Sequence, residues 1–282
     1  LGFGFLEVGS VTPVSQRGNS KPRLFRLLED SAVINRMGFN NLGSKRVSQN
    51  IKKLKKNSFV LGVNLGANKD SYDFSKDYIA GIGTFKFAAD YLVINISSPN
   101  TPGLRGLQEE NSYRNLINVI CLEKNNLLLE GIQLPIFIKI SPDISLEHLK
   151  RIIDASQEKK IDGLVISNTS TNKNLKLSSK FKNEIGGISG SPIFSRSTKA
   201  VAMAFKHSNG EIPIIGVGGI SSGIDAYEKI CAGASVIQIY TSLIYRGPNI
   251  VNEIKDFLLF KIKEDNFKSI SEAVGSRNND FL

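Results

Sequence analysis

The sequence has few residues suited to disulfide bonds or metal binding. It contains two cysteines, Cys121 and Cys231, and two histidines, His148 and His207. The cysteines lie far apart in helical patterns, with no C-x-x-C motif and no histidine nearby, which argues against a disulfide and against a zinc site. We therefore expect no metal and two buried, inert thiols. Both histidines belong to charged helical stretches, where we expect solvated rather than catalytic side chains.

Long hydrophobic runs are also absent. No stretch of 18 or more apolar residues occurs, and the first residues lack the basic start and small-residue cleavage site of a signal peptide. The printed chain therefore contains no expected membrane span. It begins at Leu1 inside an apolar, strand-like segment, so we expect the protein to have residues upstream.

The sequence has fewer acidic than basic residues, and the net charge is +10. Such a balance would suit nucleic acid, an anionic membrane or an acidic substrate. The lysines are scattered over helical segments such as NIKKLKKN, as on solvated faces, and no basic patch with interleaved aromatic residues is visible. We therefore expect no nucleic-acid partner.

Short apolar runs rich in β-branched residues alternate with amphipathic stretches, which is typical of parallel strands buried on both faces. The expected strands are residues 3–11, 59–65, 91–96, 135–140, 163–168, 212–218 and 235–240. The expected helices are residues 43–56, 70–87, 110–129, 145–159, 195–207, 222–232 and 248–264. A doubly wound sheet would give the same alternation, but seven units come closer to the eight of a closed barrel. The pattern favours one α/β domain over residues 1–282, a (β/α)8 TIM barrel whose first strand is missing from this chain.

Two segments interrupt the alternation. Residues 23–41 contain Asn and Gly in place of a clean helix, and we expect an excursion with short antiparallel strands over the barrel mouth. Residues 167–192 are polar, and we expect a long loop there. Loops of that length are uncommon in compact domains unless they serve a site.

Polar residues gather at the carboxyl ends of the expected strands, where barrel active sites are built. Four ends carry uncharged hydrogen-bonding groups or a lone lysine, which suggests a planar polar ligand: Asn64, Asn95, Ser97, Ser98, Lys139, Ser141, Ser167, Asn168 and Thr169. The last two strands end in GVGGISSG (216–223) and IYTSLIYRG (239–247). Glycine-rich turns at this position often bind phosphate, although such glycines can also serve only to make tight turns.

Eight segments, in order along the chain, resemble the dihydroorotate dehydrogenase family. They are INRMGFNN (34–41), GVNLGANK (62–69), NISSPNTPGLRGLQ (95–108), FIKISPD (137–143), ISNTS (166–170), GGISGSP (186–192), GVGGISSG (216–223) and QIYTSL (238–243). The resemblance extends over nearly the whole chain.

The resemblance implies roles for individual residues. Ser98 matches the catalytic base, and Thr101 could assist proton transfer through a water. Matches to flavin mononucleotide (FMN) contacts are Ser10, Asn64, Asn95, Lys139, Ser167 (usually threonine), Gly190, Gly219, Tyr240 and Thr241. Matches to the substrate site are Asn35, Arg36, Met37, Gly38, Phe39, Asn95, Asn100, Asn168 and Thr169.

The implied activity is oxidation of dihydroorotate to orotate in pyrimidine synthesis. Soluble relatives have cysteine in place of Ser98, so the serine indicates the membrane-linked class that passes electrons to ubiquinone or another quinone. The segment RLFRL (23–27) resembles that class, and its Arg26 matches an arginine near the quinone site, although it could be a surface residue. Localisation would be peripheral, at the mitochondrial inner membrane in a eukaryote or the cytoplasmic membrane in a bacterium.

One family feature is absent from the printed sequence. The segment of Gly-Phe-Asp-Lys type in the family's first barrel strand, whose backbone holds the flavin and whose lysine binds substrate, does not occur here, nor do the membrane-associating helices before it. Membrane contact is therefore expected through an upstream segment. Two alternatives remain open: the soluble class, which uses fumarate or NAD, and an inactive, flavin-poor fragment.

Overall fold

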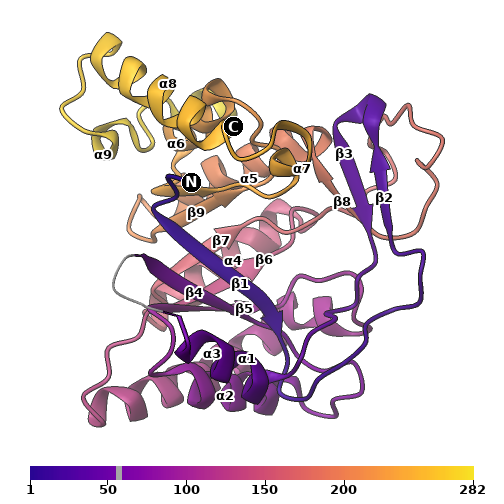
Figure 1. Cartoon of the computed structure of the whole chain (residues 1–282). Helices are drawn as coiled ribbons and strands as arrows, with labels where there is room; N and C mark the ends of the chain where they lie inside the picture. Colours follow the sequence, from indigo (N-terminus) through magenta and orange to yellow (C-terminus); the bar gives the residue numbers. More distant parts are fainter. Residues whose placement is uncertain (55–58) are drawn as a thin grey trace.

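The computed structural model describes residues 1–54 and 59–282, and its centre is a parallel seven-stranded sheet (Figure 1). In spatial order the strands are β1 (Phe5–Val11), β4 (Val60–Leu65), β5 (Tyr91–Asn95), β6 (Ile136–Ile140), β7 (Gly163–Ile166), β9 (Ile214–Val217) and β10 (Val236–Gln238). All seven expected parallel strands are confirmed, each somewhat shorter than the apolar run that predicted it. Where a run is longer than its strand, the extra residues belong to the preceding loop or to the loop at the carboxyl end of the strand.

Helices follow the strands, and most of them lie along the outside of the curved sheet (Figure 1). They are α1 (Ser44–Lys52), α2 (Phe74–Phe85), α3 (Glu110–Leu129), α4 (Leu146–Glu158), α5 (Phe194–His207), α6 (Gly223–Ala232), α7 (Thr241–Arg246), α8 (Ile250–Glu264) and α9 (Ile270–Ala273). Of the helix expected at 43–56, residues 55 and 56 lie outside the described residues. The six-residue helix α7 was not expected. Side-chain caps fix several starts, as where Ser222 Oγ accepts the Asp225 N–H at the start of α6.

The core lies in two layers on either side of the sheet. The larger one fills the space between strands and helices, and it includes Leu92 and Ile94 at 0% exposure. Inside the curve, Val93, Val165 and Ile215 pack together with Tyr91. Because β5 is buried on both faces, its sequence is an unbroken apolar run and not an alternation. The expected α/β barrel-type fold is confirmed.

Strands β1 and β10 are the two edges of the main sheet, and within the described residues no backbone ladder joins them. A side-chain bridge spans them instead, because Gln238 Nε2 donates to Glu7 Oε2 at 2.7 Å. The same carboxylate accepts from Asn64 Nδ2 at 2.9 Å and from the Tyr91 hydroxyl at 3.3 Å. Burial and the Glu7 charge raise the pKa of Tyr91, so its hydroxyl remains a donor.

A second, three-stranded antiparallel sheet stands beside the main one (Figure 1). It contains β2 (Leu24–Leu27), β3 (Ala32–Asn35) and β8 (Gly187–Gly190). The antiparallel excursion within residues 23–41 is confirmed. The expectation of a loop throughout 167–192 is wrong, because β8 lies in that segment. Its glycines gave no strand signal, and it is a strand because it pairs with β3, which is distant in sequence.

Both cysteines and His207 lie on helices. Cys231 is buried, but Cys121 is only half-buried, since its sulfur lies on an outer helix and donates to the Lys159 carbonyl. His207 Nε2 lies 2.6 Å from Asp154 Oδ1 on the outer helical layer, away from the strand ends. None of the described helices is long and apolar enough to cross a membrane.

Candidate active site

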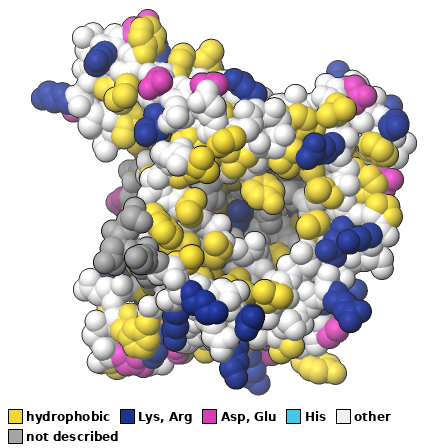
Figure 2. Space-filling model, in the orientation of Figure 1, with side chains coloured by type: hydrophobic (Ala, Val, Ile, Leu, Met, Phe, Trp, Pro, Cys, Tyr) yellow, Lys and Arg dark blue, Asp and Glu magenta, His cyan; other side chains and the backbone are white. Residues whose placement is uncertain are grey.

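A cavity of about 860 Å³ opens at the carboxyl ends of the strands. Figure 2 shows this face of the molecule hollowed near its middle, with hydrophobic side chains around the hollow. Nearly all site residues expected from the sequence line this cavity: Ser10, Asn35, Met37, Gly38, Phe39, Asn64, Asn95, Ser98, Asn100, Lys139, Ser167, Asn168, Thr169, Gly190, Gly219, Tyr240 and Thr241. Residues separated by more than 200 positions in sequence thus share one wall, because parallel strands bring their carboxyl ends to the same edge.

Two expected residues lie elsewhere. Arg36 does not line the cavity; its guanidinium donates to Glu184 Oε2 at 2.8 Å and to the Ile185 carbonyl at 2.9 Å, and it stacks over Phe25. The placement of Arg36 therefore supports a structural role in the small sheet, not substrate contact through its side chain. Arg26 is exposed on β2, outside the cavity lining, and lies close enough to influence the Tyr245 hydroxyl electrostatically.

Uncharged polar groups form a chain across the cavity floor. The Ser10 hydroxyl donates to Asn64 Oδ1 at 2.5 Å, and Asn95 Nδ2 donates to Ser10 Oγ at 3.1 Å. Asn95 Oδ1 accepts from the Ser97 hydroxyl at 2.9 Å and from Asn168 Nδ2 at 3.4 Å. These contacts fix which end of each amide is the acceptor, so the floor presents a defined pattern of donors and acceptors.

Ser98 follows this floor on the loop after β5 and is 5% exposed. Its Oγ accepts the backbone N–H of Asn100 at 3.3 Å. Asn100 Nδ2 in turn lies 3.2 Å from the Asn35 carbonyl and 3.4 Å from Asn35 Oδ1. The small sheet is thereby joined to the loop that carries Ser98, and amides from both sides face the cavity.

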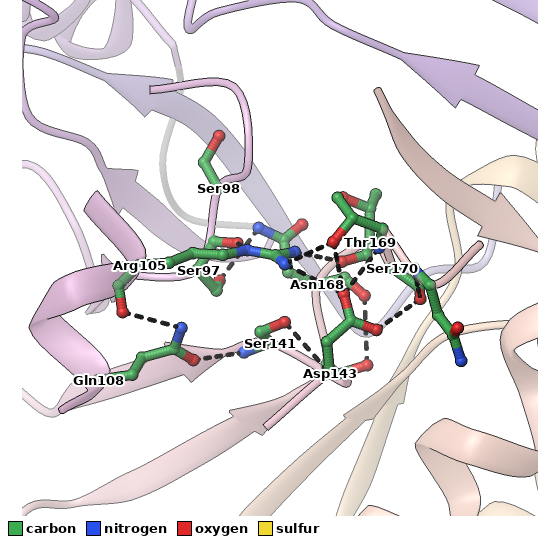
Figure 3. Close-up of polar contacts among 12 residues, drawn as sticks. Ser97, Ser98, Arg105, Gln108, Ser141, Asp143, Asn168, Thr169 and Ser170 are labelled. Atoms are coloured by element: carbon green, nitrogen blue, oxygen red, sulfur yellow. Dashed lines mark hydrogen bonds and ion pairs between the residues drawn. The ribbon is translucent and has the colours of Figure 1, made fainter. Parts of the chain in front are cut away.

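An arginine that the sequence analysis missed organises the loops beneath Ser98. Figure 3 shows Arg105 between Ser97 on one side and Asp143 and Thr169 on the other, with the Ser98 side chain turned away. Its guanidinium donates to the Ser97 carbonyl, the Asp143 carboxylate and the Thr169 carbonyl, each at 3.0 Å. Asp143 also accepts the Ser170 hydroxyl at 2.5 Å. The signal in the sequence was an arginine directly after the rigid NTPGL segment.

Lys139 is a half-buried cation on the cavity wall. It pairs in register with Asn95 on the neighbouring strand, which places it at the level of the polar floor. Among the described residues, no group of three His, Cys, Asp or Glu side chains is arranged to hold a metal ion.

The far end of the cavity is formed by the turn after β9 and the start of α7. Gly218 and Gly219 have φ of +119° and +75°, which disfavours other residues, and a Cβ on Gly219 would lie 2.7 Å from the Phe194 nitrogen. The Thr241 hydroxyl donates to Ser189 Oγ at 2.8 Å. Ser242 Oγ is buried and has no hydrogen-bond partner within the described residues. A buried orphan hydroxyl in a cavity wall fits a ligand that supplies the missing partner.

Comparison with known proteins agrees with this geometry. The family model described as dihydroorotate dehydrogenase matches residues 1–261. The chain belongs to the dihydroorotate dehydrogenase family. As a member of this flavin-dependent family, it is an oxidoreductase.

Individual relatives agree over almost the whole chain. The dihydroorotate dehydrogenase (quinone) of Bartonella tribocorum is 47% identical over 96% of this chain and 76% of its own length. The mitochondrial dihydroorotate dehydrogenase (quinone) of Mus musculus is 44% identical over 98% of this chain and 71% of its own length. The ligand-free dihydroorotate dehydrogenase structure from Eimeria tenella superposes with a TM-score of 0.92 at 40% identity, covering 98% of this chain and 82% of that one.

The cavity of this family member fits a flavin. Its floor offers alternating amide and hydroxyl groups, which suit the edge of a planar heterocycle, and Lys139 supplies one positive charge beside them. Its far end offers a glycine turn and an orphan hydroxyl, which suit the polar tail of such a ligand.

Proposed function

We propose that the chain oxidises dihydroorotate to orotate in pyrimidine synthesis, with FMN as its cofactor and a quinone as the final electron acceptor. The observation that carries this proposal is the convergence of Ser98, Lys139 and the asparagine cluster on one cavity at the strand ends. Bound FMN would accept the hydride. The remaining chemistry, holding the substrate and removing its proton, would fall to this chain's own residues.

Proton removal is assigned to Ser98. A serine hydroxyl is a weak base, so it needs hydrogen-bond contact with the substrate carbon and a route for its own proton. The Asn100 N–H bond to Ser98 Oγ uses a lone pair and leaves the hydroxyl hydrogen free to be passed on. Thr101, which is 4% exposed on the same loop, is our candidate for relaying that proton through a water.

Substrate binding is assigned to the asparagines. Orotate is planar, and its ring amides carry donors and acceptors that a carboxamide can match at both ends. Asn35 and Asn100 face the cavity from the small sheet and the Ser98 loop, and Asn95 and Asn168 face it from the floor. Thr169 and the segment from Met37 to Phe39 complete the wall on this side.

The proposed cofactor contacts fall into two groups, one at the flavin ring and one at the phosphate. Ser10, Asn64, Asn95, Ser167 and Lys139 would contact the flavin ring, and the Lys139 ammonium would stabilise negative charge on the reduced ring. Gly190, Gly219, Tyr240 and Thr241 would contact the ribityl phosphate end. Tyr240 is 79% exposed, so we expect its backbone rather than its ring to make this contact.

The quinone assignment is supported by serine at position 98 and by the names of the relatives. Arg26 is our candidate for the quinone site, at the exposed face of the small sheet. We further propose peripheral attachment to the mitochondrial inner membrane in a eukaryote, or to the cytoplasmic membrane in a bacterium.

The test is anaerobic reduction of the FMN-loaded protein. Dihydroorotate should bleach the visible flavin band, and a soluble quinone should restore it much faster than fumarate or NAD. Bleaching followed by faster reoxidation with fumarate or NAD would move the chain to the soluble class. A protein that binds no flavin, or whose flavin dihydroorotate leaves oxidised, would contradict the proposed activity.

A further inference from the structure

Lys229 is a buried cation that the proposed reaction does not use. It lies on α6, and its side chain is 0% exposed. Within residues 1–54 and 59–282, no other Lys, Arg, Asp or Glu side chain is buried. Removing an ammonium from water is strongly unfavourable unless hydrogen bonds and a counter-charge compensate it. A lysine at this position therefore needs an explanation.

The contacts of the Lys229 ammonium place it directly behind the glycine turn. Its Nζ donates to Ser197 Oγ at 2.5 Å, to the Gly218 carbonyl at 3.2 Å and to the Phe194 carbonyl at 3.4 Å. It also lies 4.5 Å from the centre of the Phe194 ring. All three hydrogen-bond acceptors are neutral, and no ion pair to Lys229 is found among the described residues. The ammonium therefore has hydrogen-bond partners, but no carboxylate in the described part of the chain forms an ion pair with it.

The hydrogen bond to Gly218 has a consequence for the cavity. In a trans peptide the N–H points opposite to the carbonyl of the preceding residue. Because the Gly218 carbonyl points toward Lys229, the Gly219 N–H points away from it. Gly218 and Gly219 both line the cavity. Lys229 thus orients the turn so that the Gly219 N–H, and not the Gly218 carbonyl, lies on the side where an anion would bind.

We propose that Lys229 is a positioning residue for the phosphate group of the cofactor: it fixes the Gly218–Gly219 peptide with its N–H toward the phosphate and supplies the buried positive charge that compensates the anion. The inference rests on the proposed function, because it requires a phosphorylated flavin in this cavity. Lys229 does not touch the cavity itself. It acts through the turn, and the phosphate provides a counter-charge in addition to those of Asp225 and Glu228, neither of which forms an ion pair with Lys229 among the described residues.

The surroundings also account for the low basicity of this lysine. Burial lowers the pKa of Lys229 to about 7, while the Asp225 and Glu228 charges on the same helix act in the opposite direction. From α5 and the turn after β9, the ammonium faces Phe194, the Ser197 hydroxyl and the Gly218 carbonyl, none of which titrates near neutrality. An anion bound on the other side of the turn would favour the protonated form.

The test compares FMN with riboflavin, which has the same ring but no phosphate. Lys229→Met removes both charge and donor, and Lys229→Gln removes the charge but retains a donor. We expect Lys229→Met to weaken FMN binding by about 10- to 100-fold, the range for a hydrogen bond that involves a charged group. Riboflavin affinity should change by less than about three-fold, and Lys229→Gln should fall between Lys229→Met and the unmodified protein for FMN alone.

A matched control is Lys263→Met, since Lys263 is an exposed lysine in the last turn of α8. It should leave both affinities unchanged. Equal weakening of FMN and riboflavin by Lys229→Met would mean that the lysine only supports the fold, and no weakening of either would remove any role in binding. Either result overturns the inference.

A measurement on the unmodified protein covers the case in which the variants do not fold. At pH 8, FMN binding should take up as much as about one proton, measured by calorimetry in buffers of different ionisation enthalpy, because the bound phosphate raises the pKa of Lys229. Riboflavin binding should take up none. Equal proton uptake for the two ligands would overturn the inference. Failure of the unmodified protein to bind either flavin would overturn the proposed function, and the inference with it.

Discussion

The Ser98 hydroxyl is held by one backbone N–H at the edge of the cavity, so its contribution to chemistry can be separated from its contribution to folding. We predict that Ser98→Ala retains bound flavin and slows flavin reduction by dihydroorotate by a factor of about 10² to 10⁴, the usual range for a lost general base. Stopped-flow absorbance measures this directly. Ser98→Cys should restore part of the rate, with a pH profile shifted to lower pH because a thiol ionises near pH 8.5. A near-normal rate in Ser98→Ala would exclude Ser98 as the base.

The lowered pKa of Lys229 predicts how the stability of the flavin-free protein changes with pH. Between about pH 7 and pH 10.5 the unfolded chain keeps the lysine protonated while the flavin-free folded state does not. The unfolded state therefore binds more protons, and stability rises with pH through this window. The burial penalty is fully present below about pH 7 and disappears toward pH 10.5.

We therefore predict that the flavin-free protein gains stability relative to Lys229→Met as the pH rises from 7 to 10, in urea unfolding. The comparison isolates Lys229, because the two proteins differ at this residue alone. A difference that stays constant, or that falls with pH, would contradict a low pKa for Lys229 in the folded state.

The loops after β5, β6 and β7 act together as one structural element because Arg105 bridges them. Its guanidinium contacts the Ser97 and Thr169 carbonyls and the Asp143 carboxylate, and a lysine cannot reach all three groups from one ammonium. We predict that Arg105→Lys lowers kcat/KM by about 10- to 100-fold, since small displacements of catalytic groups have effects of this size. Flavin content should be unchanged.

The matched control is Arg114→Lys, which changes a partly exposed arginine on α3 that pairs with Glu158. It should leave kcat/KM unchanged. Equal rates for Arg105→Lys and the unmodified protein would mean that the loops hold their positions without the arginine.

The small sheet is attached to the barrel through α7. The Tyr245 hydroxyl donates to the Ala32 carbonyl at 2.7 Å and lies 3.2 Å from the Leu27 carbonyl. Burial raises the pKa of Tyr245, so this donor persists at alkaline pH. We predict that Tyr245→Phe destabilises the β2–β3 hairpin by about 1 kcal/mol, which is about five-fold faster hydrogen exchange at its amides.

Exchange at the amides of β5 should not change in this variant, because β5 lies in the main sheet. Tyr72→Phe provides the control, since Tyr72 is fully exposed. If exchange accelerates equally in both sheets, the hydroxyl contributes to the whole domain and not to the attachment of the small sheet.

The sequence predicted the elements whose signals are local. All seven parallel strands were found because each lies in an apolar run, which is unbroken where the strand is buried on both faces, as in β5 and β7. The helix at Glu110–Leu129 was located to the residue. Strand β8 was missed because GISG is a strand only through pairing with β3. Helix α7 was missed because six residues are too few to show a helical period.

The site residues divide in the same way, into those that have a local signal in the sequence and those that do not. Ser98, Lys139 and the asparagines stand at strand ends and carry recognisable motifs. Glu7, Arg105 and Lys229 act through partners distant in sequence or through turns of the backbone, and Lys229 reads as an ordinary surface lysine of an amphipathic helix until its burial is known. Ser242 became apparent only as a buried oxygen without a partner within the described residues.

At the scale of the whole molecule, the cavity is bounded by both edges of the main sheet. Ser10 lines it from the β1 side, and Tyr240 and Thr241 line it from the β10 side, while the Glu7–Gln238 hydrogen bond spans the same two strands. A ligand that contacts both edges binds the folded state and has no site in the unfolded chain. Its binding energy therefore adds to the stability of the entire domain.

We predict that removing the flavin lowers the unfolding midpoint, and that adding FMN raises it in proportion to the logarithm of the free concentration. Stabilisation should be about 2.7 kcal/mol at 100 times Kd and about 4.1 kcal/mol at 1,000 times Kd. With about 2–4 °C per kcal/mol for large domains, the higher concentration should raise Tm by roughly 8–16 °C. Differential scanning fluorimetry over a series of FMN concentrations measures this, and its slope gives a Kd to compare with direct titration. A Tm that does not respond to FMN would mean that FMN does not bind the folded domain, because any ligand that binds only the folded state raises the unfolding midpoint.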